Sequence, residues 1–130
     1  MKENKILIVD DEESICSLYA EAFTKKGYAV STAASAEDGL DILKNENFQV
    51  MFLDLNLPGM SGVELCKQIR EEGSTAKIYA VTGYSSLYGV AECKKVGFDE
   101  IFTKPVKLEV LFKAADDAFG KKEADGSRGR

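Results

Sequence analysis

Acidic, hydroxyl and amino side chains that could bind a metal ion or a phosphoryl group each follow an apolar stretch of this chain. They are Asp10, Asp11, Asp54, Thr82 and Lys104. Three carboxylates suit a hard divalent cation, and a hydroxyl with an ammonium group suits phosphoryl oxygens. Each residue alone also has an ordinary explanation, as a helix cap, a strand residue or a surface charge. Whether they act together depends on the elements that position them.

Asp54 directly follows the apolar run Val50–Leu53 and precedes a turn that contains Pro58 and Gly59. Proline fixes its own φ and glycine accepts positive φ, so this stretch predicts a buried strand that presents Asp54 to a loop. In open parallel sheets with helices on both faces, ligands bind at the carboxyl edge of the strands. The simpler interpretation of Asp54 is a solvated acid that ends a strand.

The chain alternates short apolar runs with amphipathic helical patterns. Strands are expected at residues 5–10, 28–34, 48–54, 76–82 and 100–104, and helices at about residues 15–27, 35–43, 61–73, 85–96 and 108–119. Ser35 and Ser61 are expected to cap their helices, whereas Gly89 weakens the fourth helix. Five strand–helix units predict an α/β fold with helices on both faces of a parallel sheet. We expect a flavodoxin-like, doubly wound (βα)5 three-layer sandwich with strand order 2-1-3-4-5 and the polar second strand at an edge.

In this order, strands one, three and four are neighbours and strand five lies beyond strand four, so the five polar residues meet at one edge. Crowded carboxylates repel one another and resist ionisation unless a cation intervenes. Mg²⁺ commonly uses one or two carboxylates plus a phosphate, which fits Asp11, Asp54 and a backbone carbonyl; Ca²⁺ needs more ligands than we find. Asp54 could then attack a phosphoryl group whose oxygens Lys104 and Thr82 contact, and the product would be an aspartyl phosphate.

The 130 residues fit one domain, which we expect at residues 1–120. Residues 121–130 are expected to form a disordered tail, part of which could derive from cloning.

The composition excludes several classes of function. The absence of histidine excludes catalytic triads, the usual zinc sites and a histidine phosphodonor within this chain. A net charge of −5 disfavours direct binding to nucleic acid. Three scattered cysteines, no signal peptide and no apolar run near the ~20 residues of a membrane span favour a cytoplasmic protein.

Four motifs together resemble those of response-regulator receiver domains, the two-component signalling family that includes the chemotaxis regulator. They are Ile8-Val9-Asp10-Asp11, the stretch Leu53–Gly62, Val81-Thr82-Gly83 and Lys104-Pro105, and the similarity covers about residues 4–120. The resemblance implies that Asp54 is the phosphoacceptor and that Asp11, Asp54 and the backbone carbonyl of Asn56 bind Mg²⁺, with Asp10 acting through water. It also implies that Thr82 and Lys104 contact the phosphoryl group, and that the peptide bond before Pro105 is cis.

The same resemblance implies a signalling function rather than general enzyme activity. The phosphoryl group would come from a histidine kinase or a phosphotransfer protein, and the domain would promote only its own phosphorylation and dephosphorylation. The helix 4–strand 5–helix 5 face would then change its affinity for a downstream protein, and could also support a weak dimer of an otherwise monomeric chain. A receiver fragment of a larger regulator or hybrid kinase fits the sequence equally.

One position departs from the family pattern. The aromatic residue that usually stands three positions before the lysine, and whose rotation is linked to activation, is replaced here by Ile101. The usual coupling between Thr82 and an aromatic ring is therefore in question. Phe102, Tyr84 or Tyr88 could signal instead, although packing is the simpler role for each of them.

Three other functions share features with this sequence. A haloacid-dehalogenase-like phosphatase also uses an aspartate nucleophile, but it needs a second acid two residues later, where this chain has Asn56, and usually a cap domain. Flavin binding on the same fold needs a phosphate-binding loop after strand one, where acids stand instead. A phosphate-independent pseudo-receiver is the third, although every residue that the phosphoryl chemistry needs is present.

Overall fold

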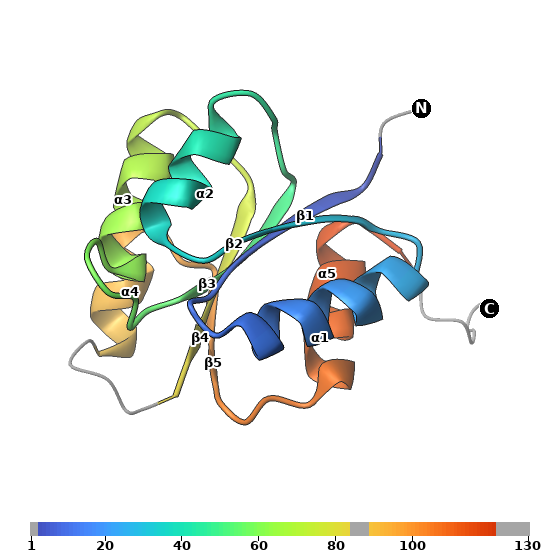
Figure 1. The fold of residues 1–130 in the computed structure, drawn as a ribbon. Helices are drawn as coiled ribbons and strands as arrows, with labels where there is room; N and C mark the ends of the chain where they lie inside the picture. Colours follow the sequence, from blue (N-terminus) through green and yellow to red (C-terminus); the bar gives the residue numbers. More distant parts are fainter. Residues whose placement is uncertain (1–2, 84–88, 122–130) are drawn as a thin grey trace.

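A parallel sheet of five strands, in the order β2-β1-β3-β4-β5, forms the centre of the fold. The computed structural model describes residues 3–83 and 89–121 (Figure 1). Its elements are β1 (Lys5–Val9), α1 (Glu13–Lys25), β2 (Ala29–Ala33), α2 (Ala36–Leu43), β3 (Val50–Asp54), α3 (Gly62–Glu71), β4 (Lys77–Thr82), α4 (Val90–Val96), β5 (Glu100–Thr103) and α5 (Leu108–Ala118). The predicted flavodoxin-like strand order and alternation of strands and helices are therefore confirmed.

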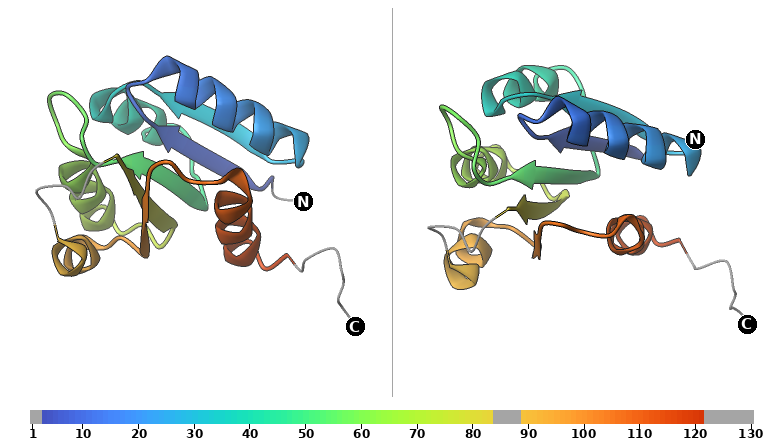
Figure 2. Two further views of the ribbon diagram at one scale, coloured as in Figure 1. Left: turned by 90° about the horizontal axis from the view of Figure 1, so that it is seen from below. Right: turned by 60° about the horizontal axis from the view of Figure 1, so that its bottom comes forward.

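Helices cover both faces of the sheet. α2, α3 and α4 pack on one face, and α1 and α5 pack on the other (Figures 1 and 2). All five residues of β3 are buried, because β3 lies between β1 and β4 and has helices on both sides. A strand in that position must be apolar on both faces, which explains the continuous apolar run before Asp54.

A row of aromatic rings forms much of the core under α1 and α5. Phe23 of α1 stacks on Phe52 of β3, Phe52 stacks on Tyr79 of β4, and Tyr79 packs against Phe102 of β5. The ring centroids are 5.5, 5.3 and 5.8 Å apart along this row. Offset aromatic pairs at such distances stabilise a core beyond the area that they bury. The row thus ties the three strands that carry Asp54, Thr82 and Lys104 to one another.

The ends of the helices agree with the predicted caps except at α4. The hydroxyls of Ser35 and Ser61 accept hydrogen bonds from the third residue after each, as the sequence indicated. The prediction that the fourth helix runs from Ser85 through Gly89 is wrong at Gly89, which has extended φ and ψ and is the N-cap of α4. Glycine is a poor helix former but a tolerated cap, so the helix begins after it. Residues 85–88 lie outside the described residues.

The strand register brings the polar residues to one edge. Val9 pairs with Leu53 and Asp54 pairs with Val81, so the ends of β1, β3 and β4 lie at the same height. Thr82 pairs with Thr103 at the end of β5, one residue before Lys104. The carboxyl edge of the sheet is therefore the place where these side chains can meet.

No helix in residues 3–83 or 89–121 is long and apolar enough to cross a membrane. The three cysteines are buried free thiols.

Two predicted backbone features are present. The chain turns after β3 as expected, since Gly59 has a φ of +75°. The Lys104–Pro105 peptide bond is cis, as the family resemblance implied.

Replacing Phe52 by Ala should lower the free energy of unfolding by about 3–5 kcal/mol, because a fully buried ring in the aromatic row is lost. Leu18 of α1 is the matched control, since its side chain is 49% exposed. Leu18→Ala should change stability by about 0.5 kcal/mol or less. Urea denaturation followed by circular dichroism measures both, and equal losses would contradict the importance of the row.

Candidate functional site

Three acids meet at the carboxyl edge of the sheet. Oxygens of Asp10, Asp11 and Asp54 lie within 4.8 Å of one another. Asp10 and Asp54 are buried, with exposed fractions of 3% and 6%, whereas Asp11 is exposed. Two buried carboxylates and one exposed carboxylate at such short range repel one another strongly, so the site requires positive charge.

Lys104 supplies part of that charge. Its Nζ lies 2.9 Å from an oxygen of Asp10, 3.4 Å from an oxygen of Asp54 and 3.7 Å from an oxygen of Glu12. Its backbone N–H donates to the carbonyl of Thr82 at 2.7 Å, which continues the pairing of β4 and β5 beyond Thr103. Lys104 is thus fixed by the sheet at its backbone and by two carboxylates at its tip.

Backbone hydrogen bonds orient both buried acids. One oxygen of Asp54 accepts from the N–H of Asn56 at 3.0 Å, and one oxygen of Asp10 accepts from the N–H of Glu12 at 2.9 Å. These are local turns in which an aspartate bonds to the backbone two residues later. In both acids the other oxygen faces Lys104.

The electrostatic state of the site follows from burial and from this pairing. Burial raises the pKa of Asp54 above its ordinary value, although the Asn56 N–H and the Lys104 ammonium lower it. Burial alone would lower the pKa of Lys104, but its hydrogen bond and charge interactions with Asp10 and Asp54 outweigh burial and raise it. Lys104 is therefore protonated, but its single positive charge does not fully offset the cost of burying the Asp54 carboxylate.

The structure also reveals a contact that the sequence reasoning missed. The side-chain amide of Asn56 donates to the hydroxyl oxygen of Thr82 at 3.2 Å. From the family resemblance only the backbone carbonyl of Asn56 had been assigned a role. No local sequence signal indicates the amide contact, because it depends on how the loop after β3 lies beside the end of β4.

Gly62 is a second residue whose importance the sequence reasoning missed. A Cβ atom there would lie 2.1 Å from the carbonyl oxygen of Asp54, a distance that no side chain can adopt. The first turn of α3 therefore packs directly on the backbone that presents Asp54. A glycine immediately after the capping Ser61, inside a helix that begins there, is the signal that could have indicated this close approach.

The residues considered for the switch lie on different faces of the sheet. Ile101 packs into the core under α3 and α4, whereas Phe102 packs against Tyr79 in the aromatic row under α1 and α5. This alternation is the ordinary consequence of strand geometry. Phe102 therefore has a packing role on the opposite face from Ile101. Tyr84 and Tyr88 lie outside the described residues.

Asp54→Asn should raise the stability of the protein near neutral pH in a buffer with a metal chelator. Because folding raises the pKa of Asp54, its contribution to stability is complete below the ordinary value of 3.8 and is lost as the pH rises through the raised pKa. The amide has no charge to bury, so the variant escapes this loss. Urea denaturation at several pH values measures the difference, which should shrink toward zero as the pH falls. A variant less stable than the wild type at neutral pH would contradict the destabilising burial of the Asp54 charge.

Comparison with known proteins identifies the family. The sequence profile of the response regulator receiver domain matches residues 6–116. Sporulation initiation phosphotransferase F of Bacillus subtilis is 35% identical over 111 residues, which are 85% of this chain and 90% of that protein. The response regulator ArlR of Staphylococcus haemolyticus is 34% identical over 82% of this chain, but the match spans only 48% of that protein.

A solved structure agrees with the sequence matches. The response regulator TrrA of Thermotoga maritima, crystallised in complex with Mg²⁺ and BeF, is 31% identical and superimposes with a TM-score of 0.79. The superposition covers 88% of this chain and 98% of that protein. Fold, sequence and family profile agree, and the chain belongs to the response regulator receiver domain family, whose function is phosphorylation-dependent signal transduction.

Proposed function

We propose that Asp54 of this receiver domain accepts a phosphoryl group from a histidine kinase or a phosphotransfer protein in a Mg²⁺-dependent reaction. The observation that carries the proposal is the position of Lys104, whose ammonium group lies between the buried carboxylates of Asp10 and Asp54. Such a cation neutralises new negative charge on phosphoryl oxygens without having to be recruited from solvent. Thr82, 3% exposed, ends the neighbouring strand.

The acids fit a magnesium ion. Mg²⁺ takes oxygen ligands and usually keeps several waters, and the oxygens of Asp10, Asp11 and Asp54 are close enough to share one ion. We assign Asp11, Asp54 and the backbone carbonyl of Asn56 as its ligands. We assign Asp10 a contact with the ion through water, as the family resemblance implies. When bound, the ion would neutralise the acids and the phosphoryl oxygens.

Asp54 acts as the nucleophile. The oxygen that accepts from Asn56 is held by the backbone, so the oxygen that faces Lys104 attacks phosphorus. An oxygen–phosphorus bond forms while the nitrogen–phosphorus bond to the donor histidine breaks, and the imidazole leaves with the electron pair of that bond. Hydrolysis by water later returns the carboxylate and inorganic phosphate. Catalysis by this chain is limited to these two reactions on itself.

Thr82 and Lys104 report the modification to the rest of the domain. The Thr82 hydroxyl, which accepts from the amide of Asn56, turns to donate its proton to a phosphoryl oxygen, and Lys104 moves from two carboxylates to the phosphoryl group. Each charge-assisted hydrogen bond contributes about 1.5–3 kcal/mol, so Thr82 and Lys104 together bias the active state by about 3–6 kcal/mol. A shift from 1:99 to 99:1 takes about 5.5 kcal/mol, which only the upper end of that range reaches. Phosphorylation by itself therefore activates the domain incompletely, and a partner completes the shift by binding the α4–β5–α5 face.

The signal travels without an aromatic switch at position 101. Ile101 faces α4 and packs in the same core as Cys93 and Val96 of that helix. A branched aliphatic residue can transmit a change at Thr82 to α4 by packing alone, because close-packed cores transmit displacement. Thr82 and Ile101 thus form the switch proposed here, and Phe102 belongs to the aromatic row.

The remaining proposals concern the bounds of the domain, its location in the cell and its partners. We assign the receiver domain to residues 1–120 and place the protein in the cytoplasm as a monomer or a weak dimer through the α4–β5–α5 face. Of the tail expected at residues 121–130, Lys121 still donates its N–H to the carbonyl of Asp116, and residues 122–130 lie outside the described residues. The match to a relative of similar length supports a domain that passes a phosphoryl group onward. The match to half of a longer response regulator supports the receiver part of a larger protein. The downstream partner is a protein in both arrangements.

Incubation with acetyl phosphate and Mg²⁺ should add one acid-labile phosphoryl group to the wild type and none to Asp54→Asn. Intact-mass spectrometry measures the uptake, and omission of Mg²⁺ should abolish it. Asp41→Asn is the matched control, since this acid is 72% exposed on α2 and should behave as the wild type. Uptake that survives Asp54→Asn would refute the assignment of the phosphoacceptor.

Lys104→Met should increase the affinity for Mg²⁺ by about tenfold, because removal of one positive charge beside the acids strengthens their attraction for another cation. The same variant should lose the response of Thr82 to beryllium fluoride. Calorimetric titration with MgCl₂ and amide chemical shifts measure the two effects. Lys25→Met, which removes a lysine that is 76% exposed on α1, controls for net charge. Unchanged Mg²⁺ affinity in Lys104→Met would contradict the proposed charge balance.

A further inference from the structure

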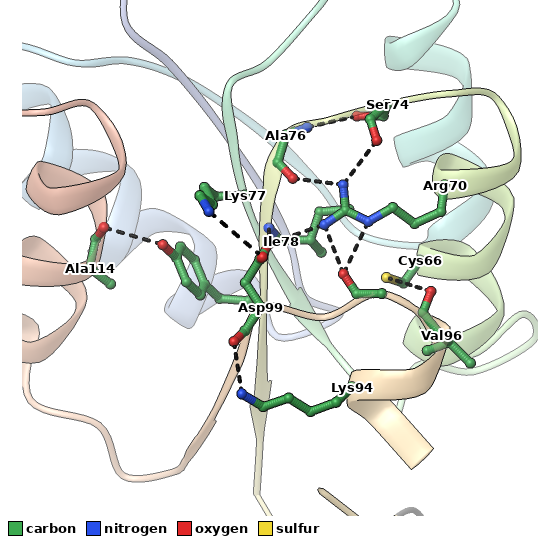
Figure 3. Close-up of polar contacts among 12 residues, drawn as sticks. Cys66, Arg70, Ser74, Ala76, Lys77, Ile78, Lys94, Val96, Asp99 and Ala114 are labelled. Atoms are coloured by element: carbon green, nitrogen blue, oxygen red, sulfur yellow. Dashed lines mark hydrogen bonds and ion pairs between the residues drawn. The ribbon is translucent and has the colours of Figure 1, made fainter. Parts of the chain in front are cut away.

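Arg70, near the carboxyl end of α3, joins several segments at the opposite edge of the sheet from Asp54. Its guanidinium group donates to the carbonyl of Gly97 twice, at 3.0 and 2.8 Å, and to the carbonyls of Ser74 and Ala76 at 3.0 and 2.7 Å. It also donates to the carboxylate of Asp99 at 3.0 Å (Figure 3). All five N–H donors of an arginine are thereby used. We call these five residues the Arg70 clamp.

Asp99 connects the clamp to the strands that carry the phosphorylation site. Its N–H donates to the carbonyl of Ile78 at 2.7 Å, and its side chain accepts from the N–H of Ile78 at 2.8 Å. These bonds precede the first paired residues of β4 and β5, Tyr79 and Glu100. The clamp therefore fixes the amino ends of the two strands whose carboxyl ends carry Thr82 and Lys104.

Gly97 allows the clamp to reach α4. It follows the last residue of that helix and has a φ of +122°, which favours glycine. A Cβ atom there would lie 2.6 Å from Cγ of Arg70 and 2.8 Å from its Nε. Only a residue without a side chain lets the guanidinium group contact the Gly97 carbonyl so closely. The carboxyl end of α4 is thus held by charged hydrogen bonds from a neighbouring helix, in addition to its packing.

Among the described residues, far fewer contacts hold the amino end of α4. Gly89, its N-cap, provides no side-chain hydrogen bond, and the side chain of Val90 is 62% exposed. The first fully buried residue is Cys93, in the middle of this short helix. A helix with one clamped end and one exposed end responds to a force by rotating about the clamped end.

We propose that Arg70 is a positioning residue for the switch, and that the Arg70 clamp holds Gly97 and Asp99 as a fixed pivot so that phosphorylation displaces only the amino end of α4. This inference rests on the proposed function, because it concerns the movement that phosphorylation of Asp54 causes. Arg70 would thus be part of the switch, although it contacts neither the acids nor the phosphoryl group. Loss of the clamp would spread the displacement along the whole helix and into the start of β5.

Amide hydrogen exchange with and without beryllium fluoride and Mg²⁺ tests the pivot. In the wild type, the probe should change exchange at Cys93, whose N–H bonds to Gly89 at the amino end of α4, but not at Gly97 or Asp99. In Arg70→Met, the probe should change exchange at Gly97 and Asp99 as well, by about tenfold, since a charged hydrogen bond is lost at each. Arg70→Lys keeps the charge without the fork of donors and should behave like Arg70→Met.

Lys77→Met is the matched control. Lys77 is also a cation beside Asp99, with Nζ 3.9 Å from its carboxylate, but its side chain is 53% exposed and it belongs to β4 (Figure 3). Its removal changes the charge near Asp99 without releasing Gly97. The response to beryllium fluoride in Lys77→Met should therefore equal that of the wild type.

Each contrary result has a distinct meaning. If Arg70→Met exchanges faster at Gly97 by the same factor with and without the probe, the clamp is only structural and the inference fails. It also fails if wild-type Gly97 responds as strongly as Cys93, or if neither responds while Asn56 does. Absence of any response at Asn56, which follows Asp54, would refute the proposed function itself. Should Arg70→Met not fold, as judged by urea denaturation, Arg70→Lys alone decides the outcome.

Discussion

The contact of one ammonium group with two buried carboxylates is the interaction on which this domain depends. Asp54 ends a strand that is buried throughout, and Asp10 directly follows the neighbouring strand β1, so the sheet that holds the core also forces two negative charges together. Lys104 offsets part of that repulsion. The offset is incomplete, because burial still holds the pKa of Asp54 above its ordinary value.

The carboxyl and amino edges of the sheet have different structural roles. At the carboxyl edge, the strand ends and the residues directly after them present the acids, the hydroxyl and the lysine. Gly62 lets α3 begin directly against the backbone of Asp54. At the amino edge, Arg70 bonds to the loop before β4, to the end of α4 and to the start of β5. In the switch proposed here, a movement that begins at the carboxyl edge meets strands whose amino ends are held by Arg70. The part of α4 that responds in this proposal is its amino end.

Much of the fold could be predicted because its signals are local. The apolar run before Asp54 and the capping Ser35 and Ser61 each indicate an element from a few neighbouring residues. Alternation of strands and helices indicates a doubly wound parallel sheet, and the polar second strand suits the edge position that it has in the observed order. The convergence of Asp54 and Lys104 was predictable for the same reason, since parallel strands end at one edge.

The contacts that were missed join residues far apart in sequence through irregular segments. Asn56 and Thr82 are 26 residues apart, and Arg70 and Asp99 are 29 apart, so neither pairing leaves a periodic pattern. The start of α4 was misplaced for a related reason. A glycine within a weak apolar pattern can be an interior residue or a cap, and only packing against α3 and β5 decides between them.

The outer edge of β5 is built against unwanted association. This border strand has four residues, begins with the exposed, charged Glu100 and is followed after one lysine by Pro105, which has no N–H to offer. A second chain that paired with β5 would have few backbone groups to hydrogen-bond, would meet the charge of Glu100 and would lose the pairing at Pro105. The domain can thus present this side to other proteins in a crowded cell without serving as a template for fibres.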